Sequence, residues 1–171
     1  LELAKKLLAE GFKVAATSRS EASLVAALGS SSENFLPLEM DLVNEKSVKA
    51  AIDKTISHFK TIDVLVNNAG YGLLGALEEL TDAESRKNFE VNVFGLLNVI
   101  RNTMPYMRAA SSGHIFNISS VGGYYGEFPG WGIYCSTKFA VAGLTESLAA
   151  EVKSFGVHAT IVYPGYFRTD F

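Results

Sequence analysis

Residues 117–138 read NISSVGGYYGEFPGWGIYCSTK, and the rest of the chain is organised around this stretch. The pattern predicts a strand that ends in two serines, a glycine-rich aromatic loop, and a helix that carries Tyr134 and Lys138. Residues four apart on a helix share one face, with β-carbons about 5–6 Å apart. A lysine beside a tyrosine favours the phenolate and lowers the phenol's pKa from about 10. With a serine hydroxyl nearby, this arrangement suits proton exchange in carbonyl–alcohol interconversion.

Composition and charge limit the class of protein. Apolar residues make up 48% of the 171 positions and charged residues 19%, which is typical of a globular domain. The net charge of −3 lacks the basic excess of a nucleic-acid binder. A single cysteine excludes an internal disulfide and predicts a reducing, cytoplasmic location. No apolar run is long enough to cross a membrane.

Strand and helix patterns alternate along the chain. Capping residues mark helix starts at Ser20, Asn44 and Thr81, the last with Glu84 in a capping box. The alternation predicts an α/β fold with a doubly wound parallel sheet, covered by helices on both faces, in a single domain over 1–171. The expected strands are 14–17, 35–40, 62–67 (expected to be buried), 114–119 and 157–163. One helix is expected to end at Gly11, and the others are expected at 20–28, 44–59, 82–107 and 134–155. The helix 44–59 has an apolar stripe of Val48, Ala51, Ile52, Thr55, Ile56 and Phe59.

Polar and turn residues gather where the expected strands end. Ligands of a doubly wound sheet bind beyond the carboxyl ends of its strands. Tyr-x-x-x-Lys is common by chance, so this convergence carries more weight than any single motif. The residues concerned are Ser18 and Arg19, Asp41 and Leu42, Asn67-Asn68-Ala69-Gly70, Ser119-Ser120, and Pro164-Gly165.

Together these residues resemble the short-chain dehydrogenase/reductases, in their single-domain branch. The motifs that carry the resemblance cover nearly the whole chain and run in this order: Asp41-Leu42, Asn67-Asn68-Ala69-Gly70, Asn92, Ile118-Ser119-Ser120, Tyr134-x-x-x-Lys138, and Pro164-Gly165 with Thr169. The resemblance implies an oxidoreductase. It would move a hydride between a nicotinamide dinucleotide and a small-molecule carbonyl or secondary alcohol.

The resemblance assigns catalytic roles to four side chains. Tyr134 is the expected general acid in reduction and base in oxidation. Lys138 is expected to lower the pKa of this phenol and to bind the nicotinamide ribose. Ser120 would orient the substrate oxygen, and Asn92 would hold a water that passes protons toward the lysine. The plainer alternatives are a packed tyrosine, a solvated lysine or asparagine, and a serine that satisfies a strand end.

The resemblance also implies the residues that contact the dinucleotide. The expected contacts are Asn68, Ala69 and Gly70 at the adenine ribose, Asp41 with Leu42 at the adenine, Tyr134 and Lys138 beside the nicotinamide, and Pro164, Gly165 and Thr169 at the nicotinamide and phosphate. The alternatives are plain: a tight turn at Gly70, a helix-start residue at Asp41, and a common Pro-Gly turn.

Residues Ser18 and Arg19 bear on the choice of cofactor. A free 2′-hydroxyl on the dinucleotide calls for a carboxylate at the end of this strand, whereas a 2′-phosphate calls for a cation. Thr17-Ser18-Arg19 holds no acid, so NADP is the expected cofactor, with NAD as the alternative. A solvent-exposed loop arginine is the rival interpretation of Arg19.

We therefore expect an NADP(H)-preferring dehydrogenase or reductase. Two other functions stay open: a non-catalytic dinucleotide-binding regulatory module on the same fold, and a sugar-nucleotide epimerase of the related extended branch. The four catalytic side chains disfavour the first, and Asn67-Asn68-Ala69-Gly70 disfavours the second. No metal site is expected, because His58, His114 and His158 lack metal-ligand spacing.

Two surfaces suggest further contacts. Helices 82–107 and 134–155 carry more apolar residues than one sheet face can cover, which favours a homo-oligomer that pairs through them, as family members commonly do. The residues are Phe89, Phe94, Leu97, Ile100, Phe139, Val141, Leu144, Leu148 and Val152. The aromatic cluster of Tyr124, Tyr125, Phe128 and Trp131 either lines an apolar pocket or packs the loop.

The chain starts inside a helical pattern at Leu1. The family's glycine-rich phosphate turn, the strand that leads into it, and any segment after Phe171 are not in the sequence. We therefore expect a fragment of a longer protein, with a sheet that lacks its first strand. We also expect the fragment to be inactive by itself.

Overall fold

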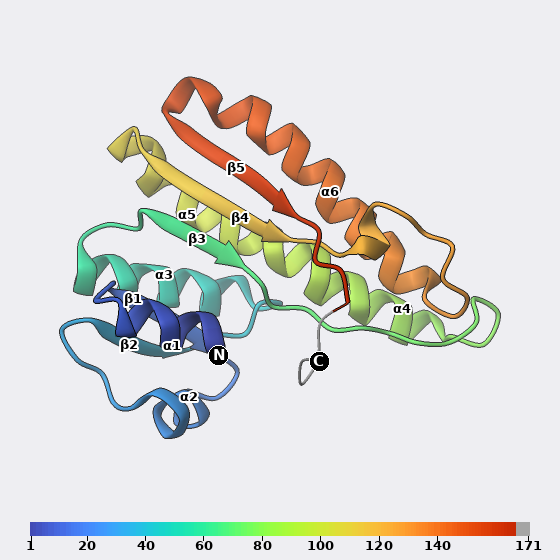
Figure 1. Cartoon of the computed structure of the whole chain (residues 1–171), viewed down its shortest axis with the longest axis horizontal. Coiled ribbons are helices and arrows are strands. Elements are labelled where there is room, and N and C mark those ends of the chain that lie inside the picture. The colour runs from blue at the N-terminus through green and yellow to red at the C-terminus, as the bar shows by residue number, and fades with distance from the viewer. Residues whose placement is uncertain (167–171) are drawn as a thin grey trace. The chain divides into compact units, whose positions relative to one another are not determined.

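The computed structural model describes residues 1–166. The chain divides into two compact units, residues 1–62 and the residues from Asp63 onward, and each is described by itself (Figure 1). The first unit holds a two-stranded sheet and the second a three-stranded sheet, both with parallel strands. The predicted α/β class with parallel strands is confirmed, and the single-domain assignment stays a prediction.

The first unit alternates helices with strands. Its elements are α1 (Glu2–Ala9), β1 (Val14–Ser18), α2 (Glu21–Leu28), β2 (Phe35–Glu39) and α3 (Glu45–Phe59). β1 and β2 pair in parallel, from Val14 opposite Phe35 to Ser18 opposite Glu39. The polar residues predicted at the ends of these strands therefore follow neighbouring strands that run in the same direction.

Helix α3 follows from local signals in the sequence. The Asn44 side chain caps it by accepting hydrogen bonds from two backbone N–H groups of the first turn, at 3.1 and 3.2 Å. The predicted apolar stripe is buried at Val48, Ala51, Ile52 and Thr55 and partly buried at Ile56 and Phe59. The helix packs this stripe against β2. Cap and stripe are both confirmed.

The second unit carries the longer helices. Its elements are β3 (Val64–Asn67), α4 (Asp82–Phe89), the π-helical turn η1 (Glu90–Gly95), α5 (Leu96–Ala110), β4 (Gly113–Ile118), the 3-10 turn η2 (Val121–Gly123), α6 (Gly132–Val152), the 3-10 turn η3 (Lys153–Phe155) and β5 (Val157–Val162). The strand order is β3-β4-β5. Because all three strands are parallel, their carboxyl ends lie at one edge of the sheet.

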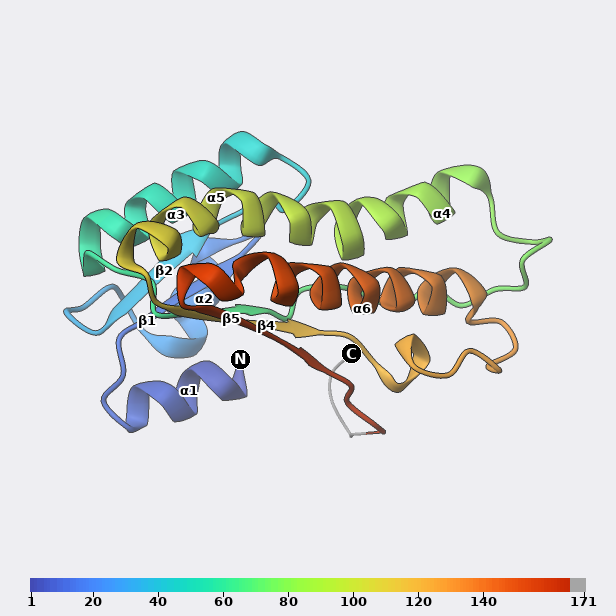
Figure 2. The same cartoon turned by 90° about the horizontal axis from the view of Figure 1, so that it is seen from above.

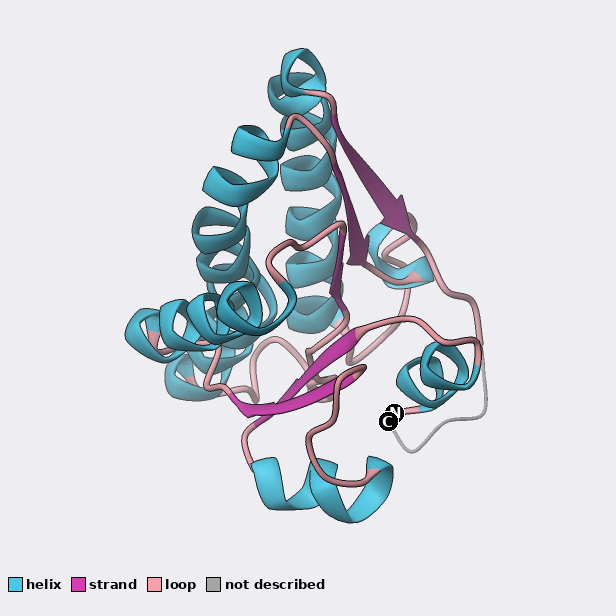
Figure 3. Cartoon of the chain, turned by 90° about the vertical axis from the view of Figure 1, so that its left-hand side faces the viewer, coloured by secondary structure: helices cyan, strands magenta, loops and turns pink. Residues whose placement is uncertain are grey.

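Helices α5 and α6 lie side by side on one face of this three-stranded sheet (Figures 2 and 3). The layer between helices and sheet is apolar and closely packed. Ile115 of β4 and Val141 of α6 are fully buried, and Met107 of α5 is 1% exposed. Burying each such side chain contributes about 1.5–3 kcal/mol, so this layer holds α6 against the strands.

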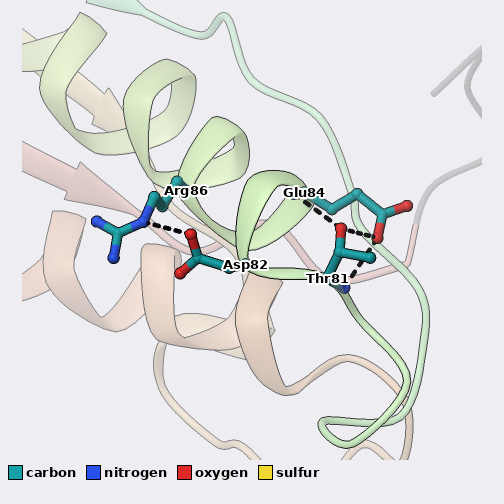
Figure 4. Close-up of polar contacts among 4 residues, drawn as sticks. All are labelled: Thr81, Asp82, Glu84 and Arg86. Atoms are coloured by element: carbon teal, nitrogen blue, oxygen red, sulfur yellow. Dashed lines mark hydrogen bonds and ion pairs between the residues drawn. The ribbon is translucent and has the colours of Figure 1, made fainter.

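A capping box starts α4, as predicted (Figure 4). Thr81 Oγ1 accepts from the Glu84 backbone N–H at 3.3 Å, and the Glu84 carboxylate accepts from the Thr81 N–H at 3.0 Å. Asp82 and Arg86 form an exposed ion pair on the same turns, at 2.8 Å. Such a surface pair adds little stability, so the box is the main local signal for the start of the helix.

The prediction of one continuous helix over 82–107 is wrong in one respect. The helix is interrupted by the π-helical turn Glu90–Gly95, in the middle of which Asn92 lies. A π turn accommodates an extra residue and rotates the side chains that follow relative to a regular helix. Apolar spacing alone does not reveal such a turn, because buried residues occur on both sides of it.

Strand β3 is less buried than predicted. Its first residue, Val64, is 55% exposed, and the other residues of the strand are partly buried. Within its sheet β3 is an edge strand whose partner is β4. An apolar run predicts a strand, but it does not tell on which sides that strand is covered.

Burial within the single chain removes several residues from the expected subunit interface. Ile100, Val141, Leu148 and Val152 are buried in the described structure. Phe94 and Phe139 are 49% and 45% exposed, and Phe89, Leu97 and Leu144 are partly buried, so these five apolar side chains are still available on the two helices. Pairing of two copies through these helices stays a prediction.

Two expected absences concern the described part of the chain. Among residues 1–166, no helix combines the length and the apolar character needed to cross a bilayer. The same residues contain no cluster of three or more histidine, cysteine or acidic side chains that could hold a metal ion.

Replacing Thr81 by Ala should destabilise the protein by about 1 kcal/mol, because the first turn of α4 loses a capping acceptor. Urea unfolding of the protein expressed from its complete reading frame measures this change. The control is Ser57→Ala, which alters an exposed serine inside α3 and should stay within about 0.5 kcal/mol. Equal effects of the two substitutions would contradict the capping role.

Candidate active site

The second unit brings four sequence-predicted side chains to the end of β4. Ser120 is the second residue after the strand, Tyr134 and Lys138 lie on the first turns of α6, and Asn92 lies in η1. Ser120 also starts η2, because its Oγ accepts from the Gly122 backbone N–H at 3.1 Å. The β4–α6 connection and the start of α6 therefore deliver a hydroxyl, a phenol and an ammonium to one region.

Tyr134 and Ser120 are hydrogen-bonded to one another through their side chains. The pKa of Tyr134 is raised above its usual value of 10, chiefly because burial penalises the phenolate, while the bond with Ser120 acts in the opposite direction. Trp131 packs edge-on against the phenol ring, with ring centres 5.6 Å apart. The net shift of the Tyr134 pKa is therefore upward, opposite to the predicted lowering, and the phenol keeps its proton at neutral pH.

Lys138 is buried, with 6% of its surface exposed. Its Nζ donates to the Ile118 carbonyl at 2.9 Å and lies 5.8 Å from the centre of the Tyr134 ring. Burial lowers the pKa of the ammonium from 10.5 to about 8. The alternative of an ordinary solvated lysine is excluded by this burial.

Ser119, the first serine of the strand end, bonds the backbone of Lys138. Its Oγ donates to the Lys138 carbonyl at 2.8 Å, and the residue is 3% exposed. Ser119 therefore fixes the backbone of Lys138, whereas Ser120 is hydrogen-bonded to the phenol of Tyr134. Sequence analysis singled out only Ser120 for a role.

Asn92 is 2% exposed and points into the unit, so the solvent-facing alternative is excluded. Its Oδ1 accepts from the Tyr71 backbone N–H at 3.0 Å, and its Nδ2 donates to the Tyr71 carbonyl at 3.0 Å and to Thr137 Oγ1 at 3.1 Å. The side-chain amide is thus bonded to protein groups on both ends. Its expected role in holding a water stays a prediction.

Gly70 lies where a β-carbon would be in tight contact with its neighbours. A β-carbon on this residue would lie 3.0 Å from Asn92 Oδ1 and 3.6 Å from Lys138 Nζ. The absence of a side chain therefore lets the backbone after β3 approach both residues. Asn68 and Ala69, just before it, are exposed.

Two polar residues of this region were missed by sequence analysis. Thr137 is fully buried between Tyr134 and Lys138, and Asn88 is fully buried one turn before Asn92. Asn88 Nδ2 donates to the Tyr71 carbonyl at 3.0 Å, as Asn92 does. The available signal was the pair of asparagines four residues apart, in a helix where asparagine is a poor choice.

The remaining predicted cofactor residues fall into two groups. Pro164 and Gly165 follow β5, and the Pro164 carbonyl accepts from the Val121 N–H of η2 at 2.9 Å, which ties this segment to the end of β4. Thr169 lies outside the described residues. The others belong to the first unit, at the ends of β1 and β2: Ser18, Arg19, Asp41 and Leu42.

The first-unit residues differ in what their side chains do. Arg19 is exposed directly after β1. Ser18 Oγ accepts from the Ser20 N–H at 3.3 Å, and Asp41 Oδ1 accepts from the Val43 N–H at 3.1 Å. Asp41 thus stabilises its own turn, three residues before the Asn44 cap of α3, whereas Arg19 presents a cation at a strand end.

Of the aromatic cluster of the β4–α6 loop, one ring lines an open cavity of mixed polar and apolar lining, and the rings also pack on one another and on their neighbours. Phe128 lines a cavity of about 460 Å³ together with Leu77, Glu127, Pro129 and several glycines. Trp131 packs on Tyr134 instead, and Tyr124 packs on Tyr163 with ring centres 5.8 Å apart. The cavity lies between this loop and residues 75–77, and the Gly75 N–H donates to the Gly130 carbonyl at 2.8 Å to join the two segments.

Comparison with known proteins extends these observations. The family model described as short chain dehydrogenase matches residues 1–171. An uncharacterized oxidoreductase of Schizosaccharomyces pombe is 42% identical over 139 residues, which cover 81% of this chain and 58% of that protein. A 3-ketodihydrosphingosine reductase of Bacteroides thetaiotaomicron is 45% identical over 134 residues, which cover 78% of this chain and 49% of that protein. The chain thus spans about half the length of these curated relatives.

The fold agrees with the sequence match. The solved structure of ElxO with NADP bound superposes with a TM-score of 0.91 at 34% identity, over 99% of this chain and 69% of that one. The match extends over both units, and the motifs from Asn67 to Lys138 fall at the strand ends and helix turns described above. The chain therefore belongs to the short-chain dehydrogenase family.

Proposed function

We propose that the protein containing this chain is an NADP(H)-preferring oxidoreductase that interconverts a carbonyl and a secondary alcohol. The observation that carries the proposal is the hydrogen-bonded pair of Ser120 and Tyr134 beside the buried ammonium of Lys138. A phenol, a hydroxyl and a cation in one partly buried site are the groups that proton transfer to a carbonyl oxygen requires.

Tyr134 is the proposed proton donor in reduction. Burial raises the pKa of its phenol, so the proton is present at neutral pH when a carbonyl oxygen arrives. Ser120 shares a hydrogen bond with this phenol, so an oxygen placed between the two hydroxyls accepts from both. Two donors aimed at one oxygen stabilise the charge that develops on it as the carbonyl is reduced.

Lys138 is the proposed electrostatic partner of the phenol. With a pKa of about 8, its ammonium is mostly charged at neutral pH. Its positive charge lies 5.8 Å from the Tyr134 ring centre and favours the tyrosinate that remains after proton transfer. Because Lys138 is buried and Tyr134 is partly buried, this attraction is screened less than it would be in water.

The residues available for a dinucleotide fit such a cofactor. The exposed backbone at Asn68 and Ala69, followed by Gly70 without a side chain, permits close approach of a ribose. Arg19 is exposed at the end of β1, and a cation there suits a 2′-phosphate. When bound, the dinucleotide supplies or accepts the hydride. NADP is present in the ElxO structure, which supports the same choice here.

One observation argues against each of the two rival functions. A module that only senses a dinucleotide has no need to bury an ammonium beside a phenol, and burial of a charge is costly. The epimerase alternative shares the Tyr-x-x-x-Lys pattern, but the relatives described above include a reductase of a ketone and an oxidoreductase. Both observations support carbonyl–alcohol chemistry.

Replacing Tyr134 by Phe in the complete protein should reduce kcat by a factor of about 100 or more, because the proposed proton donor is lost. Binding of NADPH should survive, since the ring and its packing on Trp131 remain. NADPH oxidation with a panel of ketones, and fluorescence titration of the cofactor, measure the two properties. Tyr124→Phe removes an exposed phenol and serves as the control. A Tyr134→Phe variant that kept more than about a tenth of the rate would overturn the proposed proton transfer.

Replacing Arg19 by Ala should weaken NADPH binding about tenfold or more and leave NADH nearly unchanged. A hydrogen bond to a charged group contributes roughly 1.5–3 kcal/mol, which corresponds to this factor. Isothermal titration with both cofactors measures the preference. The control is Lys13→Ala, which removes an exposed cation just before β1 instead of after it. Equal losses for both cofactors would show that Arg19 does not recognise the phosphate.

Replacing Lys138 by Met should change how stability depends on pH. The folded pKa of Lys138 is about 8 against a reference of 10.5, so within this window the unfolded chain binds a proton that the folded chain does not. Stability of the wild type should therefore rise with pH across the window, by at most about 3 kcal/mol. The variant should lack this rise.

Chemical unfolding of the cofactor-free protein at several pH values between about 7 and 11 measures this difference. Lys153→Met, which removes an exposed lysine just after α6, is the control and should follow the wild type. If the wild type and Lys138→Met show parallel stability curves, the lysine is not held as described.

A further inference from the structure

We propose that Thr137 is a positioning residue, which holds the first turns of α6 in place against Asn92 and the segment 70–71. Thr137 would touch neither substrate nor cofactor, and it would act through Tyr134 and Lys138, its neighbours on the helix. This inference rests on the proposed function, because it concerns how the proposed catalytic pair is held.

The Thr137 hydroxyl is fully buried and has a partner on each side. Its Oγ1 donates to the Tyr134 carbonyl at 2.7 Å and accepts from Asn92 Nδ2 at 3.1 Å. The hydroxyl thus links the backbone of Tyr134 to a side chain 45 residues earlier. A buried bond of this kind resists displacement, because breaking it leaves both partners without water to replace it.

The link continues beyond Asn92 to the segment after β3. The other end of the Asn92 amide and its remaining N–H bond both backbone groups of Tyr71, at 3.0 Å each. Gly70 precedes Tyr71, and a β-carbon on it would lie within 3.6 Å of Lys138 Nζ. One continuous set of hydrogen bonds therefore runs from the Tyr134 carbonyl to the backbone that closes off the lysine.

This arrangement makes the surroundings of the ammonium depend on Thr137. If the hydroxyl is removed, α6 and the segment 70–71 are no longer tied through Asn92. Water then gains access to Lys138 Nζ, and the phenol of Tyr134 loses part of its fixed position. Small displacements of reacting groups are expensive for catalysis, so the chemical step should suffer more than cofactor binding.

Thr145 provides a matched control on the same helix. It is 1% exposed, its Oγ1 donates to the Val141 carbonyl at 2.6 Å, and it accepts from Asn117 Nδ2 at 2.9 Å. Thr137 and Thr145 thus have the same chemistry, the same burial and the same type of partner. They differ in that Thr145 lies two turns farther from Tyr134 and bonds a residue of β4 instead of Asn92.

The test compares Thr137→Val, Thr145→Val, Thr137→Ser and Tyr134→Phe in the protein expressed from its complete reading frame. Thermal melting, kcat, the KM for NADPH, and the pH profile of kcat/KM for a reduced ketone are measured for each. Both valine variants should lower the melting temperature to a similar extent, since each leaves a buried asparagine N–H without its threonine acceptor. Only Thr137→Val should lower kcat, by about tenfold, which corresponds to about 1.4 kcal/mol in the barrier.

The pH profile separates positioning from a general loss of structure. The wild-type rate should fall as Lys138 loses its proton near its folded pKa of about 8. In Thr137→Val a better hydrated lysine should move this fall upward, toward the ordinary pKa of a lysine. Thr145→Val should keep the wild-type profile. Thr137→Ser retains the hydroxyl and should restore kcat to within about twofold of the wild type.

The outcomes distinguish this inference from the proposed function. If Tyr134→Phe keeps its rate, the proposed function and the positioning role are both overturned. If Tyr134→Phe is inactive but Thr137→Val matches Thr145→Val in kcat and pH profile, only the positioning role is overturned. If Thr137→Val does not fold, Thr137→Ala and Thr145→Ala replace the two valine variants, and the same comparison decides.

Discussion

The burial of the Lys138 ammonium is the constraint on which the rest of the second unit depends. A charge taken out of water costs several kcal/mol unless protein dipoles replace its hydration. The end of β4 holds this residue twice: the Ile118 carbonyl accepts from Nζ at 2.9 Å, and Ser119 Oγ donates to the Lys138 carbonyl at 2.8 Å. The ammonium and the backbone of Lys138 are both bonded to one strand end. Together these bonds fix the position of α6 along the sheet.

The fixed position of α6 along the sheet explains why a glycine, Gly123, stands between the strand and the helix. A β-carbon on Gly123 would lie 2.6 Å from the Lys138 carbonyl oxygen, far inside contact distance. A side chain there would push η2 away from α6 and break the bond from Ser119. The stretch 117–138 therefore combines two requirements: hydroxyls and charge where the proposed chemistry takes place, and no side chains where the chain passes close to the helix.

The signals that predicted the fold correctly were local ones. Asn44 and Thr81 cap helices through residues two or three positions away, so a short stretch of sequence is enough to recognise them. The bond from Asn92 to Thr137 is different, because it joins residues 45 positions apart. The π-helical turn that carries Asn92 is local, but it leaves no mark in the apolar spacing. The pKa of Tyr134 is also not readable from spacing. Its direction depends on whether burial or charge dominates, and here burial does.

Polar residues under the sheet give α6 a second fixed point. Asn67 Nδ2 donates to Asn117 Oδ1, and Asn117 Nδ2 donates to Thr145, each at 2.9 Å, so a buried chain of amides joins β3, β4 and the helix. Apolar contacts such as those of Val141 tolerate small sliding movements, whereas hydrogen bonds are lost within a few tenths of an ångström. Buried polar groups can specify one arrangement even where they add little net stability. Asn117 and Thr145 therefore fix the middle of α6 against the sheet, whereas Asn92 and Thr137 tie its first turns, which carry Tyr134 and Lys138.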